Sequence, residues 1–142
     1  MGFVRQEQTR GTGDAVCSGL GVLPSEGVVV VMNGDAPLLR VDALQRLLEA
    51  HGNHLVTVLT VELDDPASYG RIVRSDAGIE IVEAANATEG QLAIREINSG
   101  IYAFDIAWLR EVLPTLPAHP PKGEVYLTDT LALASALGRA QA

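Results

Sequence analysis

Cysteine is nearly absent from this sequence, and long apolar runs are missing. Cys17 is the only cysteine, which excludes an internal disulfide and suits a reducing compartment. No stretch of about 18 or more apolar residues is present, and the amino terminus has no signal-peptide core. We therefore expect a soluble, cytoplasmic protein with no membrane partner. Internal repeats and linkers are also absent, so the 142 residues are expected to belong to one domain.

Basic residues are scarce as well. Lysine and arginine number 10 against 18 acidic residues, which gives a net charge of −8 and a pI of about 4.7. This balance argues against a nucleic-acid backbone or an anionic membrane as a partner. A small anionic ligand remains compatible if local cations or a metal offset the charge. The three histidines form no metal-binding pair on any predicted element.

The chain is organised around residues 28–39, VVVVMNGDAPLL. A continuous apolar run is typical of a central strand that is buried on both faces. Asn33-Gly34 alone indicates a hairpin turn, but Pro37 and the helical spacing of residues 38–51 favour strand, loop and helix. Asp35 would then lie in the crevice beyond the carboxyl end of the strand. A carboxylate there is suited to hold a divalent cation against a phosphate.

The remaining pattern predicts a mixed α/β body with a mostly parallel sheet flanked by helices and a small β-hairpin subregion. The strand at 28–32, the helix at 38–51 and a strand at 56–63 form a strand–helix–strand unit. A short helix before Pro24 precedes this unit. After it we expect a hairpin (69–74 and 79–83), weakly helical residues (84–95), a strand (96–104), a helix (105–113), a proline-rich loop (114–123) and a helix (130–137). Gly100 indicates a bulge or a close backbone approach, and Trp108 is expected in the core.

Two features could contact a ligand, although each also has a plainer interpretation. The loop Gly11-Thr12-Gly13 opens a helix and could bring backbone N–H groups close to a ligand, or it could simply be a loop. Arg71 and Lys122 could bind phosphate, but solvent exposure is the expected fate of each.

Six motifs, taken together and in order, carry a resemblance to a known family. They are GTGDAV, VVVMNGDAPLL, LDDPASYGRIVR, IVE, EINSGIYAF and KGEVYLTD. From about Gln6 to Gly138 the chain resembles the uridyltransferase domain of bacterial N-acetylglucosamine-1-phosphate uridyltransferase. The resemblance implies a Rossmann-like nucleotide-diphospho-sugar transferase fold. It also implies transfer of uridylyl from UTP to N-acetylglucosamine 1-phosphate, with Mg²⁺ as cofactor and pyrophosphate as the second product.

The resemblance also assigns roles to residues of this chain. It implies that Gln6, Gly11 and Thr12 contact the uracil, that Asp35 binds Mg²⁺, that Asn33 and Gly34 lie beside the nucleotide sugar, and that Gly70, Glu83 and Asn98 hold the N-acetylglucosamine portion. Amides and backbone groups can pair with a uracil edge, and a carboxylate can accept hydrogen bonds from sugar hydroxyls. Without the family pattern, Glu83 could be a solvated charge and Asn98 a turn former.

The chain departs from the family at both ends. The family's glycine-rich loop, whose Arg and Lys hold the triphosphate, does not occur in this sequence. Its second magnesium ligand, an asparagine, has no match after Gly138, and the acetyltransferase half is absent. We therefore expect residues 1–142 to be a partial nucleotidyltransferase domain with absent or very slow turnover, which self-associates or needs a completing partner. The alternatives are a transferase for another sugar, a non-catalytic nucleotide-sugar-binding module or a split subunit.

Overall fold

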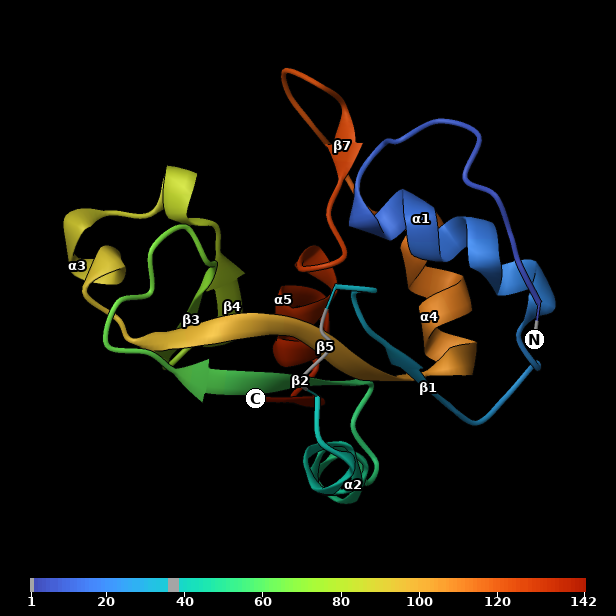
Figure 1. Cartoon of the computed structure of the whole chain (residues 1–142), viewed down its shortest axis with the longest axis horizontal. Coiled ribbons are helices and arrows are strands. Elements are labelled where there is room, and N and C mark those ends of the chain that lie inside the picture. Colours follow the sequence, from blue (N-terminus) through green and yellow to red (C-terminus); the bar gives the residue numbers. More distant parts are fainter. Residues whose placement is uncertain (1, 36–38) are drawn as a thin grey trace.

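The computed structural model describes residues 2–35 and 39–142. Helices and strands alternate along most of the chain (Figure 1). In chain order the elements are α1 (Thr12–Gly19), η1 (Leu20–Val22), β1 (Val28–Val31), α2 (Val41–His51), β2 (Val56–Glu62), β3 (Arg71–Ser75), β4 (Gly78–Val82), η2 (Ala84–Asn86), α3 (Glu89–Leu92), β5 (Glu96–Asp105), α4 (Ile106–Val112), η3 (Leu113–Thr115), β6 (Ala118–His119), β7 (Glu124–Val125), α5 (Asp129–Ala136) and β8 (Ala140–Gln141). The predicted mixed α/β class is confirmed.

The ten-residue strand β5 is the centre of the main sheet. β2 pairs along one side of β5, while β1 and β3 pair with opposite ends of its other side. All these pairings are antiparallel, and β2 with β8 is the one parallel pair among the described residues. β1 and β2 do run in the same direction, as the strand–helix–strand pattern predicted, but β5 is inserted between them. The prediction of mostly parallel neighbours is therefore corrected, because local spacing carries no information about an inserted strand.

β1 is not the fully buried central strand that its apolar run predicted. In the part of the chain that the structure describes, β1 pairs with β5 alone, and Val28 is 48% exposed. Val29 and Val31 pack against the larger core cluster and Val30 against the smaller one, so both faces of the strand are covered only in part. The helix predicted to begin at Leu38 is α2, which begins at Val41 in the described residues. Residues 36–38 themselves lie outside the description.

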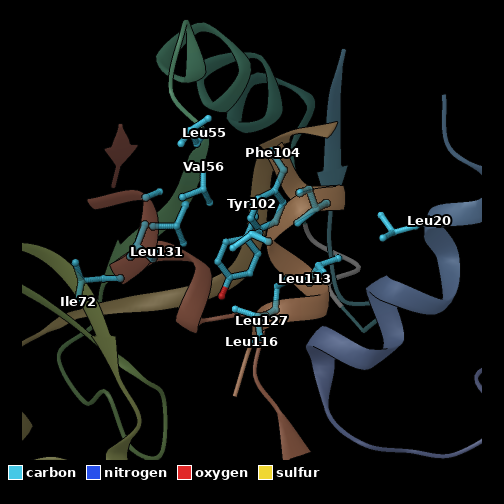
Figure 2. Close-up of a cluster of buried hydrophobic side chains, with 14 residues drawn as sticks. Leu20, Leu55, Val56, Ile72, Tyr102, Phe104, Leu113, Leu116, Leu127 and Leu131 are labelled. Atoms are coloured by element: carbon cyan, nitrogen blue, oxygen red, sulfur yellow. The ribbon is translucent and has the colours of Figure 1, made fainter. Parts of the chain in front are cut away.

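Alternation along β5 divides the core between the two faces of the sheet. Ile101 and Ala103 point toward α2 and meet Leu47. Tyr102 and Phe104 point the other way, into the larger cluster, with their ring centroids 5.6 Å apart. Figure 2 shows these two rings among leucines of α5, η3 and the chain before α5. One layer of helix therefore covers each face, and α2 is separated from α4 and α5 by the sheet (Figure 1).

Most of the other elements agree with the sequence predictions. The β3–β4 hairpin is present, the register of β2 against β5 shifts opposite Gly100, and Trp108 packs against the larger cluster. The two-residue strands of the β6–β7 hairpin, and β8, were not predicted, because pairs this short have no recognisable periodicity. No helix in residues 2–35 and 39–142 has the length and apolarity needed to cross a membrane.

Arg71 is buried, so both of its predicted fates, phosphate ligand and solvated charge, are wrong. Its side chain is 3% exposed, at the start of β3. The guanidinium donates to the carbonyl oxygens of Leu92 and Pro66, both at 3.4 Å, of Ala67 at 3.1 Å, and of Tyr69. Arg71 thus joins the loop before β3 and the end of α3 to the sheet. Lys122, in contrast, is exposed, as expected.

Candidate functional site

One open pocket of about 820 Å³ lies on the face of the sheet opposite α2. It is bounded by α1, the end of β1, η2, β5, the β6–β7 hairpin and the start of α5. The lining residues are Thr12, Ala15, Val16, Val31, Met32, Asn33, Glu83, Ala85, Asn86, Asn98, Gly100, Tyr102, His119, Pro120, Tyr126, Leu127 and Thr128. This volume is of the size that holds small molecules and cofactors.

The start of α1 is held against the segment that leads into α5. The Thr12 hydroxyl accepts a hydrogen bond of 3.0 Å from the Leu127 N–H. The Val125 N–H donates to the Arg10 carbonyl at 2.8 Å. Gly11 lies directly on the backbone of Val125, because a Cβ at position 11 would be 2.9 Å from the Val125 nitrogen. These contacts position Thr12 at one end of the pocket.

Polar groups gather at the opposite end of the pocket, around the bulge of β5. The Asn98 N–H donates to the Gly70 carbonyl, and Asn98 Oδ1 accepts from the Gly100 N–H, both at 2.9 Å. A Cβ at Gly70 would be 3.4 Å from Glu83 Oε2, so Gly70 lies immediately behind the Glu83 carboxylate. The bulge thus brings an amide and a carboxylate to the same wall.

Two further residues complete this wall. Gly100 has a φ of 77°, and a Cβ there would be 2.5 Å from Asn33 Nδ2, so a glycine lets the Asn33 side chain approach the bulge. Burial raises the pKa of the Tyr102 hydroxyl far above its ordinary value, and the Glu83 charge adds to this increase. The side chain of Asn98 acts in the opposite direction, by hydrogen bonding to Tyr102. Tyr102 therefore stays protonated beside Glu83.

The structure brings together most of the residues proposed from the motifs. Thr12, Asn33, Glu83 and Asn98 line the pocket, Gly70 lies behind Glu83, and Gly11 lies behind Thr12. Gln6 does not line the pocket, and its amide instead donates to Asp14 Oδ2 at 2.7 Å. Gly34 and Asp35 are exposed in the turn after β1 and are not among the lining residues. Asp35 was expected to share this groove with Thr12, Glu83 and Asn98, and it does not line the pocket with them.

Aromatic and imidazole side chains that were not proposed from the sequence also line the pocket. Tyr102 lies in an apolar strand pattern, which gives no sign of a polar role. Tyr126 lies in the KGEVYLTD motif, for which the resemblance assigned no residue to the site. His119, in the proline-rich segment, also lines the pocket. A strand pattern shows that a tyrosine alternates inward, but it does not show what its hydroxyl will meet.

The motif resemblance implies Mg²⁺ as a cofactor and Asp35 as its ligand. Within the described ranges no group of three or more His, Cys, Asp or Glu residues could hold a metal. The described residues therefore provide no site in which protein side chains alone would surround a metal ion. Mg²⁺ commonly takes one or two carboxylates and completes its shell with waters and substrate phosphates. The single exposed carboxylate of Asp35 fits that second kind of site.

The sequence was compared with known proteins. A family model described as "Nucleotidyl transferase" matches residues 1–141, nearly the whole chain. The chain belongs to the nucleotidyl transferase family. This membership confirms the family that the six motifs indicated. The pocket described above is therefore the pocket of a nucleotidyl transferase.

Individual members of the family are close to this chain in sequence. The chain is 48% identical over 138 residues to "Bifunctional protein GlmU" of Corynebacterium aurimucosum, covering 94% of this nucleotidyl transferase chain and 28% of that protein. It is 50% identical over 134 residues to the protein of the same name from Mycobacterium avium, covering 90% and 27%. The chain therefore spans just over a quarter of the length of these curated relatives. The resemblance drawn from the motifs is confirmed by these matches.

Solved structures support the fold. The chain matches UDP-glucose pyrophosphorylase in complex with UDP-glucose with a TM-score of 0.69 at 18% identity, covering 99% of this chain and 56% of that one. The apo form of a UDP-glucose pyrophosphorylase matches with a TM-score of 0.73 at 20% identity, covering 99% and 55%. At these identities the likeness shows the fold, and the predicted nucleotide-diphospho-sugar transferase fold is confirmed.

Proposed function

We propose that this chain provides the sugar-nucleotide pocket of an enzyme that transfers uridylyl from UTP to N-acetylglucosamine 1-phosphate. The products are UDP-N-acetylglucosamine and pyrophosphate. The observation that carries the proposal is the convergence of Thr12, Asn33, Glu83 and Asn98, four residues assigned by the motif resemblance, on one pocket. The identity to proteins named GlmU supports the choice of sugar and nucleotide.

The two ends of the pocket suit the two ends of such a ligand. At the α1 end, Thr12 is surrounded by Ala15, Val16 and Leu127, which offer an apolar surface to a flat base. At the β5 end, Glu83 can accept hydrogen bonds from sugar hydroxyls, while Asn33 and Asn98 offer amide donors and acceptors. Gln6 is proposed to act at the base through the loop that it supports, because its amide already binds Asp14.

The negative charge of the substrates requires a cation, because the net charge of the chain is itself −8. We propose Asp35 as the protein ligand of Mg²⁺, which would enter with the phosphates and offset their charge when bound. Gly34 and Asp35 lie together in the turn that follows β1. The chain's own side chains then orient the sugar phosphate for in-line attack on the α-phosphate of UTP.

Binding of UDP-N-acetylglucosamine to the chain tests this proposal. We expect isothermal titration calorimetry to show one site, with weaker binding of UDP and weaker binding of a sugar nucleotide with a different base. Glu83→Gln should lower the affinity for UDP-N-acetylglucosamine about tenfold, because a charge-assisted hydrogen bond is replaced by a neutral one. It should leave the affinity for UDP within about twofold.

Glu89→Gln is the matched control, because Glu89 is an exposed carboxylate on α3 outside the pocket. Its affinities should equal those of the unaltered chain. Failure of the unaltered chain to bind UDP-N-acetylglucosamine, or equal losses in the two variants, would contradict the proposed site.

The edge position of β1 favours a second candidate, a subunit completed by another chain. β1 pairs on one side only among the described residues, and Val28 and Met32 are 48% and 45% exposed. Such an edge can accept a further strand. We expect the isolated chain to sediment as an assembly larger than a monomer and to release no pyrophosphate above background from UTP, N-acetylglucosamine 1-phosphate and Mg²⁺. A sharp monomer peak, or rapid pyrophosphate release by the chain alone, would count against this candidate.

A further inference from the structure

His119 occupies an unusual place in the pocket. Among the described lining residues it is the one basic side chain, and Glu83 is the one carboxylate. His119 Nε2 is 2.7 Å from Asp129 Oδ2 at the start of α5. Because an ionised carboxylate can only accept, Nε2 must carry the hydrogen and donate it. The imidazole is therefore held in one orientation by a residue outside the pocket lining.

The ring of a tyrosine stacks on the His119 imidazole. The rings of His119 and Tyr126 are stacked, with centroids 4.5 Å apart and planes 20° from parallel. Tyr126 also donates from its hydroxyl to Glu124 Oε2 at 3.1 Å, and Glu124 lies opposite His119 in the β6–β7 pairing. The four side chains thus form one connected group that ties the hairpin to α5.

Two members of this group, His119 and Tyr126, line the same pocket as the predicted sugar residues Glu83 and Asn98. The hydrogen bond to Glu124 is the largest cause of the raised pKa of the Tyr126 hydroxyl, and the negative charges of Glu83 and Asp129 add to it. Tyr126 and Glu83 therefore both line this pocket, and the Tyr126 ring gives it a flat apolar surface. Such a wall suits the C–H face of a sugar ring, while Glu83 receives its hydroxyls.

We propose that His119 is a positioning residue that fixes the Tyr126 ring as a wall of the sugar subsite and so sets the affinity for the sugar portion of a nucleotide sugar. The inference rests on the proposed function. His119 acts by stacking on Tyr126, and the hydrogen bond between His119 and Asp129 holds the imidazole in place. An imidazole ring does both tasks at once, because its edge donates while its face stacks.

Calorimetric titration of the chain with two probes tests the role of His119. UDP-N-acetylglucosamine carries the sugar and UDP lacks it. We expect His119→Ala to weaken binding of UDP-N-acetylglucosamine about tenfold and binding of UDP less than about twofold. His119→Phe keeps the stacked ring and His119→Gln keeps a donor, so each should lose about threefold for the sugar nucleotide.

A double-mutant cycle separates positioning from a general structural effect. In the background of Tyr126→Leu, His119→Ala should change the affinity for UDP-N-acetylglucosamine by less than about twofold, because the wall that His119 positions is already gone. Equal losses for both probes, full losses in the Tyr126→Leu background, or no loss in His119→Ala would each overturn the inference while the proposed function stands. If the unaltered chain binds neither probe, the proposed function fails and this inference fails with it.

Discussion

Arg71→Met is expected to lower the free energy of unfolding by about 3 kcal/mol or more. Removing one partner of a buried hydrogen bond typically costs about 1–3 kcal/mol. Arg71 is 3% exposed, and its guanidinium donates to the carbonyls of Pro66, Ala67, Tyr69 and Leu92. Methionine fills a similar length of the cavity but supplies no donor, so these carbonyls lose their partner together.

Urea denaturation followed by circular dichroism measures this loss. Arg71→Lys should be intermediate, because a compact ammonium keeps the charge but cannot span carbonyls on both sides as a planar guanidinium does. The control is Arg46→Met on α2, where the side chain is 74% exposed and pairs with Asp42 at 3.5 Å. That variant should change the free energy of unfolding by about 0.5 kcal/mol or less. Equal denaturation midpoints for the two methionine variants would contradict the structural role of Arg71.

Gly11→Ala should be the most damaging small substitution near the pocket. We expect it to lower the free energy of unfolding by about 3 kcal/mol. Gly11 has a φ of 97°, in the region that disfavours any residue with a Cβ. The added methyl would also meet the backbone of Val125, whose nitrogen is 2.9 Å away. Because a paired backbone cannot move aside like a side chain, α1 must shift, and with it the hydrogen bond between Thr12 and Leu127.

Gly19→Ala is the matched control for this prediction. Gly19 ends the same helix, has an ordinary helical φ of −82°, and a Cβ there would meet nothing within 4 Å. Alanine at this position should leave stability unchanged or raise it by up to about 1 kcal/mol. Thermal unfolding and titration with UDP-N-acetylglucosamine are the measurements. If Gly11→Ala unfolds at the same temperature as Gly19→Ala and binds equally well, the close approach of α1 to β7 is wrong.

The elements were predictable where local periodicity was strong. Residues 41–51 show the helical spacing of one apolar stripe, residues 56–62 are rich in β-branched side chains, and the turn composition of residues 75–78 joins two strands of a hairpin. The two-residue strands β6, β7 and β8 were not predicted. A two-residue strand exists only because its partner is present, and nothing within it favours a strand in isolation.

The site was predictable in part, and through resemblance more than through physical chemistry. Glu83 and Asn98 were singled out by family motifs, and the structure places both on one wall of the pocket. Asp35 was assigned to the same groove, but it is exposed in the turn after β1 and is not among the lining residues. Tyr126 and His119 were not assigned, because their role depends on a stacking partner and a hydrogen-bond acceptor that fold close to them.

Local sequence patterns were enough to specify the class of the fold, the order of most helices and strands, and the motif residues that carry the family resemblance. These properties follow from spacing along a few turns or one strand. Three other features became visible only in the folded chain: β5 separates β1 from β2, Arg71 is buried against four carbonyls, and His119 reaches Asp129. Each of these depends on segments that are distant in the chain, and the free energy that selects them comes from burial and pairing available only after the chain has folded.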